Sequence, residues 1–259
     1  MIFDRIVCGV DGSPAGFEAL HQAILLRPDA ASVVAVTVCE TQMAMRTGAA
    51  AGQLTADLRE GASEARDTAA QQLRGVPFGE ARMVDGEPVP SLLGVVAGES
   101  ATLLAIGTHE GGRLAGMLLG SVATSALRQA PCSVLVARAS GDRAWSPGSI
   151  VAGMDGSREA AASAEIAAEL GDRFGATVRP IAAGGGSQLD EEALREIEGL
   201  EWASANPVDA LVDASRDADL VMVGSRGLRA FAALGSVSER VAHQAHCSVL
   251  VVRPQAAAT

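Results

Sequence analysis

Lysine and tyrosine are both absent from this sequence of 259 residues, so arginine carries all of its side-chain positive charge apart from histidine. The chain therefore has no catalytic lysine and no lysine to grip a phosphate, which excludes a P-loop mechanism. Aromatic residues are scarce, at 3%, whereas 48% of the residues are hydrophobic. The buried cores must consist mainly of Ala, Val, Leu and Ile.

Acidic residues outnumber basic ones, which gives a formal net charge of −11 and a pI near 4.8. Such a surface repels nucleic-acid phosphates and anionic lipid headgroups. The longest apolar runs, such as residues 133–137, are far shorter than the roughly 20 residues of a membrane span. The N-terminus has no basic and apolar segments of a signal peptide. We expect a cytoplasmic protein with neither nucleic acid nor a membrane as its partner.

Each of the four cysteines lies in or at the end of an apolar, strand-like run. They form no Cys-x-x-Cys pair, and none has a His or Asp nearby at the spacing of metal ligands. We expect them to be reduced core residues rather than ligands or disulfides. They are Cys8, Cys39, Cys132 and Cys247.

The strongest signal is an internal repeat. Residues 6–13 recur as residues 150–157 at an offset of 144, and residues 130–138 recur as residues 245–253 at an offset of 115. Two matching ends in the same order indicate a duplicated unit whose second copy is 29 residues shorter (144 − 115).

The repeat predicts one domain over residues 1–140 and a shortened one over residues 149–254, with a linker at 139–148 that carries Gly and Pro. Within each unit, apolar strand-like runs alternate with helical patterns, which predicts an α/β fold with parallel strands and right-handed crossovers. Ligands of such sheets bind at the carboxyl ends of the strands. In the first copy we predict strands at 5–10, 32–39, 81–85, 102–107 and 133–137, and helices at 14–26, 53–73, 90–98 and 121–129; the second copy adds a short charged helix at 190–198.

The first candidate motif is Asp-Gly-Ser directly after a strand, at Asp11 to Ser13 and again at Asp155 to Ser157. The carboxylate can accept hydrogen bonds from ribose or adenine, and the serine opens a helix, whose N-terminus favours anions. The alternative is a simple turn with an N-cap. The tripeptide alone does not decide between them.

The second motif is a glycine-rich loop after the fourth strand, over residues 107–121 in the first copy and 224–236 in the second. Glycine lets the backbone approach a ligand closely. The final Gly-Ser opens a helix whose N–H groups can face phosphates without any lysine. The alternative is a loop that only connects a strand to a helix.

Together, the strand with Asp-Gly-Ser, the glycine loop and the last strand with Pro-Cys-Ser-Val-Leu-Val resemble the universal stress proteins. The resemblance covers nearly the whole chain, twice, and so implies two Rossmann-like domains, each an open five-stranded parallel sheet between helices. Many members bind ATP or a related adenine nucleotide, and some that lack the loop bind none. Members commonly pair through their last strands. The edges at 134–136 and 249–251 are therefore expected to meet as an internal pseudo-dimer, and pairing into a further homodimer stays open.

Carried over by position, the resemblance implies that Asp11 lies near ribose, the backbone of Val38 near adenine, and the Gly-Ser of the loop near the phosphates. The implied nucleotide-binding residues of the first copy are Val10, Asp11, Ser13, Val38, Ile106, Gly107, His109, Glu110, Gly120, Ser121 and Val122. Those of the second copy are Asp155, Ser157, Ala183, Gly224, Arg226, Gly227, Gly235, Ser236 and Val237.

Both copies depart from the family pattern. Glu110 replaces the second glycine of the first loop, where its charge would repel phosphates unless it swings outward or binds through Mg²⁺. In the second copy only seven residues separate Gly227 from Gly235, two fewer than the pattern has, although Arg226 and Arg229 offer positive charge. The first copy is the better candidate, because loop length is harder to compensate than one side chain.

No pair of base and nucleophile stands out, so we assign no catalytic residue. The favoured function is binding of an adenine nucleotide in stress response or signalling. The alternatives are slow ATP hydrolysis and a nucleotide-free interaction protein with degenerate loops. Trp202 is expected to pack in the third strand of the second copy.

Overall fold

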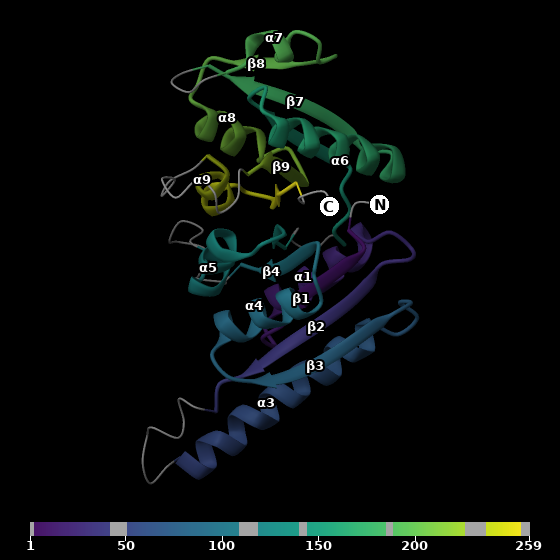
Figure 1. Cartoon of the computed structure of the whole chain (residues 1–259), viewed down its shortest axis with the longest axis vertical. Helices are drawn as coiled ribbons and strands as arrows, with labels where there is room; N and C mark the ends of the chain where they lie inside the picture. The colour runs from purple at the N-terminus through teal and green to yellow at the C-terminus, as the bar shows by residue number, and fades with distance from the viewer. Residues whose placement is uncertain are drawn as a thin grey trace.

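The computed structural model describes residues 3–41, 51–108, 119–139, 144–184, 189–225 and 237–254 (Figure 1). One sheet of ten strands runs through the molecule in the order β3-β2-β1-β4-β5-β10-β9-β6-β7-β8. The first half of the chain contributes β1 (Arg5–Gly9), α1 (Pro14–Leu26), β2 (Ser32–Cys39), α3 (Ala51–Gln72), β3 (Gly79–Asp85), α4 (Pro88–Gly98), β4 (Leu103–Gly107), α5 (Ser121–Gln129) and β5 (Ser133–Ala137). The second half contributes β6 (Ser149–Met154), α6 (Arg158–Phe174), β7 (Thr177–Ala183), α7 (Glu191–Leu194), β8 (Glu201–Ala203), α8 (Pro207–Ala214), β9 (Leu220–Gly224), α9 (Val237–Gln244) and β10 (Ser248–Val252).

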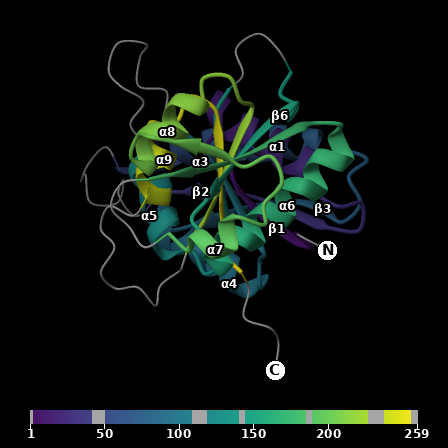
Figure 2. The ribbon, with the colours of Figure 1, turned by 90° about the horizontal axis from the view of Figure 1, so that it is seen from above.

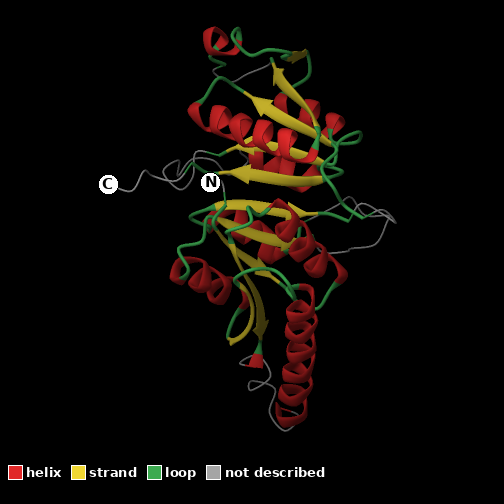
Figure 3. Cartoon of the chain, turned by 90° about the vertical axis from the view of Figure 1, so that its right-hand side faces the viewer, coloured by secondary structure: helices red, strands yellow, loops and turns green. Residues whose placement is uncertain are grey.

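The five strands of each half are parallel to one another, which confirms the predicted class of fold. The halves join where β5 pairs with β10 in antiparallel fashion, with Val136 opposite Val249 and Val134 opposite Val251. The last strands thus meet within one chain. Figure 3 shows the strands of both halves as one stack, with the long α3 beside its lower part. Because β5 and β10 run in opposite directions, the carboxyl ends of the two sets of strands lie at opposite edges of the sheet.

Helices cover both faces of the sheet, and each face has its own apolar core. Leu20 of α1, Ala69 of α3 and Leu170 of α6 belong to one core. The other core includes Leu127 of α5 and Leu211 of α8, together with residues of α4 and α9. Figure 2 shows α5, α8 and α9 together on one side and α1 and α6 on the other. Equivalent helices of the two halves therefore cover the same face, as a two-fold repeat requires.

Local sequence explains where the elements begin and end. The hydroxyl Oγ of Ser13 accepts from the N–H of Gly16 at 3.1 Å and so caps α1, with Pro14 at the first helical position. The predicted bounds of β2, α5 and β5 are confirmed to the residue. The charged helix predicted at 190–198 is shorter in the structure, because Asp190 is the N-cap of α7 and the helix ends at Leu194.

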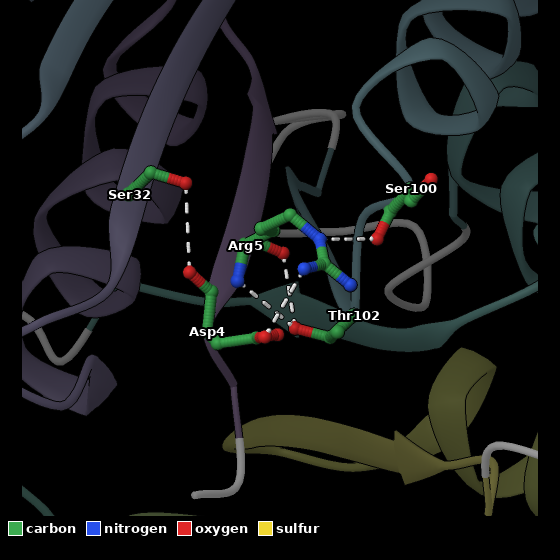
Figure 4. Close-up of polar contacts among 5 residues, drawn as sticks. All are labelled: Asp4, Arg5, Ser32, Ser100 and Thr102. Atoms are coloured by element: carbon green, nitrogen blue, oxygen red, sulfur yellow. Dashed lines mark hydrogen bonds and ion pairs between the residues drawn. The ribbon is translucent and has the colours of Figure 1, made fainter. Parts of the chain in front are cut away.

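Polar side chains fix the start of the central strands (Figure 4). Thr102 Oγ1 accepts from the N–H of Arg5 at 3.2 Å and donates to its carbonyl at 3.1 Å, which ties β1 to the start of β4. The guanidinium of Arg5 reaches the carbonyl of Ser100 at 2.8 Å. In the second half the residue that corresponds to Thr102 is Asp219, whose carboxylate accepts from the N–H of Ser149 at 2.9 Å. In each half a side-chain oxygen at this position accepts from the first N–H of the neighbouring strand, a hydroxyl in the first half and a carboxylate in the second.

The described end of the linker, residues 144–148, includes a buried aromatic side chain. Trp145 is only 3% exposed and packs in the core under α1 and α6. Its indole N–H donates to the carbonyl of Asp219 at 3.2 Å. This tryptophan therefore packs in the core that the two halves share.

The expectation that Trp202 packs in the third strand is wrong. Trp202 does lie in that strand, β8, but 55% of its surface is exposed. The cause is its position, because β8 has three residues and forms one end of the sheet. Within the described part of the chain, none of the helices is long and apolar enough to cross a membrane.

Candidate functional site

The order of the strands reverses at two places, between β1 and β4 in the first half and between β6 and β9 in the second. Crevices at the carboxyl ends of strands open at such points in doubly wound sheets. Asp11 follows β1 and Gly107 ends β4, so these predicted residues lie at one of these points. Asp155 and Gly224 hold the same places in the second half. The fold therefore brings the aspartate of the first motif and the first glycine of the second motif to the same switch point in each half.

The carboxylate of Asp11 is fixed by the start of α1. Its Oδ1 accepts from the N–H of Ser13 at 3.0 Å and from the Ser13 hydroxyl at 2.5 Å. Asp11 is nevertheless exposed. In the second half Asp155 accepts from the N–H of Ser157 at 2.9 Å. An oriented, exposed carboxylate of this kind can accept hydrogen bonds from ligand hydroxyl or amino groups.

The glycines that end β4 and β9 allow a close approach between strand and helix. A Cβ on Gly107 would lie 2.3 Å from the carbonyl oxygen of Ala15 in the first turn of α1. A Cβ on Gly224 would lie 2.5 Å from the carbonyl oxygen of Glu159 in α6. Both glycines were predicted as ligand-facing residues. The structure adds a packing role, because each lets its helix N-terminus sit against the crevice.

The first half offers the N-terminus of α5 to an anion. Gly120 is the N-cap, with φ −62° and ψ 164°, and has no side chain with which to satisfy the first N–H groups. Ser121 is exposed and Val122 is half-buried. No acidic residue lies in the first turn of α5, whereas α9 carries Glu239 in its own. A carboxylate there already complements the helix dipole, so α5 is the better anion site.

Three other predicted residues of the first half have side chains that are buried or half-buried. Val10 and Ile106 are buried at 2% and 3% exposure, and both belong to the packed core. The N–H of Val10 donates to the carbonyl of Val36 at 2.9 Å. Val38 is half-buried near the end of β2, beside β1. These residues lie at the carboxyl ends of β1, β4 and β2, next to the switch point of the first half.

The second half contains a cleft of about 80 Å³ at its switch point. This volume is small beside the roughly 300–1,000 Å³ of typical ligand pockets. Its lining includes the predicted residues Asp155, Ser157, Ala183, Gly224 and Val237, and also Leu189, Pro207, Leu211 and Ser238, which the motifs did not indicate.

Asp190 packs on the aspartate turn of the second half. Its N–H donates to the carbonyl of Asp155 at 3.1 Å. A Cβ on Gly156 would lie 2.6 Å from the Cβ of Asp190, so this residue rests directly on the turn that follows β6. The equivalent glycine of the first half, Gly12, faces Ala65 of α3 instead, at 3.4 Å. The two sites therefore differ in what covers the aspartate turn.

The remaining predicted residues lie outside the described part of the chain: His109, Glu110, Arg226, Gly227, Gly235 and Ser236. Among the described residues, no group of three or more His, Cys, Asp or Glu side chains is placed to hold a metal ion. Burial raises the pKa of Cys132 to about 11 and that of Cys247 to about 12, so both thiols are protonated at neutral pH. Cys132 is buried and Cys247 is half-buried.

The fold and its switch points define a doubly wound α/β protein built from two similar halves. The model of the universal stress protein family matches residues 2–138 and 186–253, and the chain therefore belongs to this family. It is 28% identical over 214 residues to a universal stress protein of Mycobacterium tuberculosis H37Rv, covering 69% of this chain and 70% of the relative. A relative from Mycobacterium bovis is 28% identical over 206 residues, covering 67% and 68%.

The fold is also similar to a solved structure. The crystal structure of a universal stress protein from Archaeoglobus fulgidus superposes with a TM-score of 0.76 at 18% identity. The match covers 96% of this chain and 98% of that one. The whole arrangement of two halves thus recurs in another member of the family.

Proposed function

We propose that this chain binds ATP or a related adenine nucleotide at the first switch point and acts through that binding in stress response or signalling. The observation that carries the proposal is the N-terminus of α5, where Gly120 provides no side-chain cap, at the same edge of the sheet as the oriented carboxylate of Asp11. Backbone N–H groups would hold the phosphates and Asp11 the ribose hydroxyls. Membership of the family supports the choice of an adenine nucleotide.

The absence of lysine is compatible with this mode of binding. A helix N-terminus stabilises an anion through oriented N–H groups and its dipole, so no ammonium side chain is needed. Mg²⁺ would enter with the nucleotide phosphates, because no cluster of ligands for it exists among the described residues.

In the second half, the cleft of about 80 Å³ is small for a whole nucleotide. Asp190 rests on the aspartate turn, and Glu239 occupies the first turn of α9. We infer that this half binds a complete nucleotide weakly or not at all. The chain should then hold one ATP.

The test is to denature the purified chain, to identify released small molecules by mass spectrometry, and to titrate the nucleotide-free chain with MgATP by calorimetry. We expect an adenine nucleotide at a stoichiometry near one. Gly120→Val should abolish this binding, because a branched side chain blocks the approach of phosphate to the backbone. Gly94→Val is the matched control, since a Cβ on Gly94 meets nothing within 4 Å. ATP binding that persists in Gly120→Val would place the site elsewhere.

A further inference from the structure

Two arginines, Arg138 buried and Arg253 half-buried, cross the seam between the halves in a reciprocal arrangement. Arg138 follows β5 and is only 4% exposed, and Arg253 follows β10. The two occupy equivalent positions of the repeat, at the offset of 115. Each guanidinium reaches into the other half, to the end of the helix that precedes the last strand there.

Arg253 binds the C-terminal end of α5. Its Nη1 donates to the carbonyl of Cys132 at 3.2 Å and to that of Ala130, and its Nη2 donates to the carbonyl of Leu127. The last carbonyls of a helix have no partner within the helix. A guanidinium at this end supplies both the missing donors and the positive charge that the helix dipole favours.

Arg138 makes the matching contacts with α9. Its Nη1 donates to the carbonyl of Cys247 at 3.1 Å and its Nη2 to the carbonyl of Ala242 at 2.5 Å. These acceptors correspond to Cys132 and Leu127 at the same offset of 115. The contact is therefore a repeated element of the fold rather than a single coincidence.

Each capped helix has a predicted phosphate site at its other end. With nine residues, α5 is about 13 Å long, so a displacement of its C-terminus is transmitted to Gly120 and Ser121. The buried face of α5 consists of Ala123, Ala126 and Leu127. Alanine side chains bury little apolar area, so packing alone fixes this helix weakly. A polar anchor at its C-terminus should then matter for its position.

We propose that Arg253, a residue of the second half, is a positioning residue for the phosphate site of the first half through its hold on α5. Arg138 holds α9 in the same way. The proposal rests on the proposed function, because it concerns the same site at Gly120. It predicts that an exchange in one half changes ligand binding in the other.

The charge of both groups persists at neutral pH. Burial lowers the pKa of Arg138 to about 10 and also lowers that of Arg253, yet Arg138 still titrates well above pH 7. Replacement by methionine, which is similar in length but apolar, therefore removes the charge and the hydrogen bonds together. Lysine keeps the charge and a donor.

The decisive experiment compares Arg253→Met with Arg138→Met, its matched control, in calorimetric titrations of the full chain with MgATP. Both variants lose one guanidinium that binds helix carbonyls across the seam. Arg253→Met should weaken the Gly120-dependent site by roughly tenfold, or ~1.4 kcal/mol, although Arg253 lies in the other half. Arg138→Met should leave this site unchanged, although Arg138 lies in the same half. Arg253→Lys should bind ATP more tightly than Arg253→Met, because lysine keeps the charge and a donor. If Arg253→Met fails to fold, Arg253→Lys takes its place in the comparison with the wild-type chain.

Hydrogen exchange of the ligand-free chain gives a second reading. Arg253→Met should speed the exchange of the amides of α5 but not those of α9, and Arg138→Met should do the reverse. Equal loosening of both helices, or equal loss of ATP affinity in both variants, would overturn the proposal and indicate a general loss of stability. A wild-type chain that binds no ATP contradicts the proposed function instead, whereas wild-type binding that survives Arg253→Met contradicts the positioning role alone.

Discussion

The carbonyl oxygen of Ala15 occupies the space that a side chain on Gly107 would need, 2.3 Å from the place of its Cβ. The contact is between backbone atoms, so neither partner can turn away without moving β4 or α1. The second half repeats it between Gly224 and Glu159. The strand-end glycine of each half is thus required by packing even before any ligand is considered.

Gly107→Ala should therefore destabilise the chain by about 1–3 kcal/mol, the usual effect of overpacking. Gly224→Ala should do the same for the second half. Urea unfolding followed by circular dichroism measures both effects. Gly98→Ala is the control, because a Cβ there meets nothing within 4 Å. If Gly107→Ala is as stable as the control, the close approach of β4 and α1 is not real.

Much of the fold could be predicted from local patterns. β2 and β5 are runs of apolar and β-branched residues between turn residues, and their bounds match the prediction. The internal repeat then predicted the same order of strands and helices in the second half. The exposure of Trp202 could not be predicted, because an alternating or apolar pattern does not show which strand ends the sheet.

The candidate site was predictable only in part. Asp11 and Gly107 carry recognisable motifs and do meet at a switch point. Asp190, Arg138 and Arg253 were not indicated, because their roles depend on contacts with residues far away along the chain. Arg253, for example, binds the carbonyl of Cys132, which lies 121 positions earlier. No local pattern encodes such a contact.

The cysteines should be unreactive in the folded chain. Burial raises the pKa of Cys132 to about 11, so roughly one thiol in a thousand is ionised at pH 8. The pKa of Cys247 is raised to about 12, and that of Cys8 is raised by burial and by Asp11. A disulfide reagent at pH 8 should modify these thiols slowly in the native chain and rapidly in urea. Rapid native modification of Cys132 would contradict its burial.

Stability should fall between pH 7.5 and 5.5. Burial lowers the pKa of His243 below its ordinary value of 6.5, so in this range the unfolded chain binds more protons than the folded one, and acid favours unfolding. His246 is shifted in the same direction. The carboxylates of Glu80 and Glu201 have lowered pKa values, so their contribution is lost only at lower pH, below about 4.5.

The measurement is urea unfolding at pH 7.5 and at pH 5.5 for the wild-type chain and His243→Gln. The variant should lose less stability than the wild type over this interval, because glutamine does not titrate. An identical loss in both chains would mean that His243 is protonated as readily in the folded chain as in the unfolded one.

Glu110→Gly tests the electrostatic cost of the altered loop. Glu110 stands where the family pattern has glycine, in the loop before Gly120. If its carboxylate repels the phosphates, its removal should tighten ATP binding by about tenfold, or ~1.4 kcal/mol. Calorimetry at low and high salt checks this, because screening should reduce the difference. An unchanged affinity at low salt would mean that the carboxylate faces away from the phosphates.

Gln22 should stabilise the seam through a buried bridge. Its amide Nε2 donates to the carbonyl of Arg138 at 2.9 Å, and its Oε1 accepts from the hydroxyl of Ser248 at 2.8 Å. All three residues are buried. Gln22→Leu should cost about 1–3 kcal/mol, because it removes two buried hydrogen bonds and leaves the carbonyl of Arg138 with the longer contact from Ser248 at 3.3 Å. The matching position of the second half is Ile166, so an apolar side chain suits this part of the helix.

A double-mutant cycle separates this bridge from general packing. Ser248→Ala should destabilise the wild-type chain more than it destabilises Gln22→Leu, with a difference of about 1 kcal/mol measured by urea unfolding. The reason is that in Gln22→Leu the hydroxyl of Ser248 has already lost its nearer acceptor and keeps the carbonyl of Arg138 at 3.3 Å. Strictly additive effects would show that Gln22 contributes only its volume to the stability of the seam.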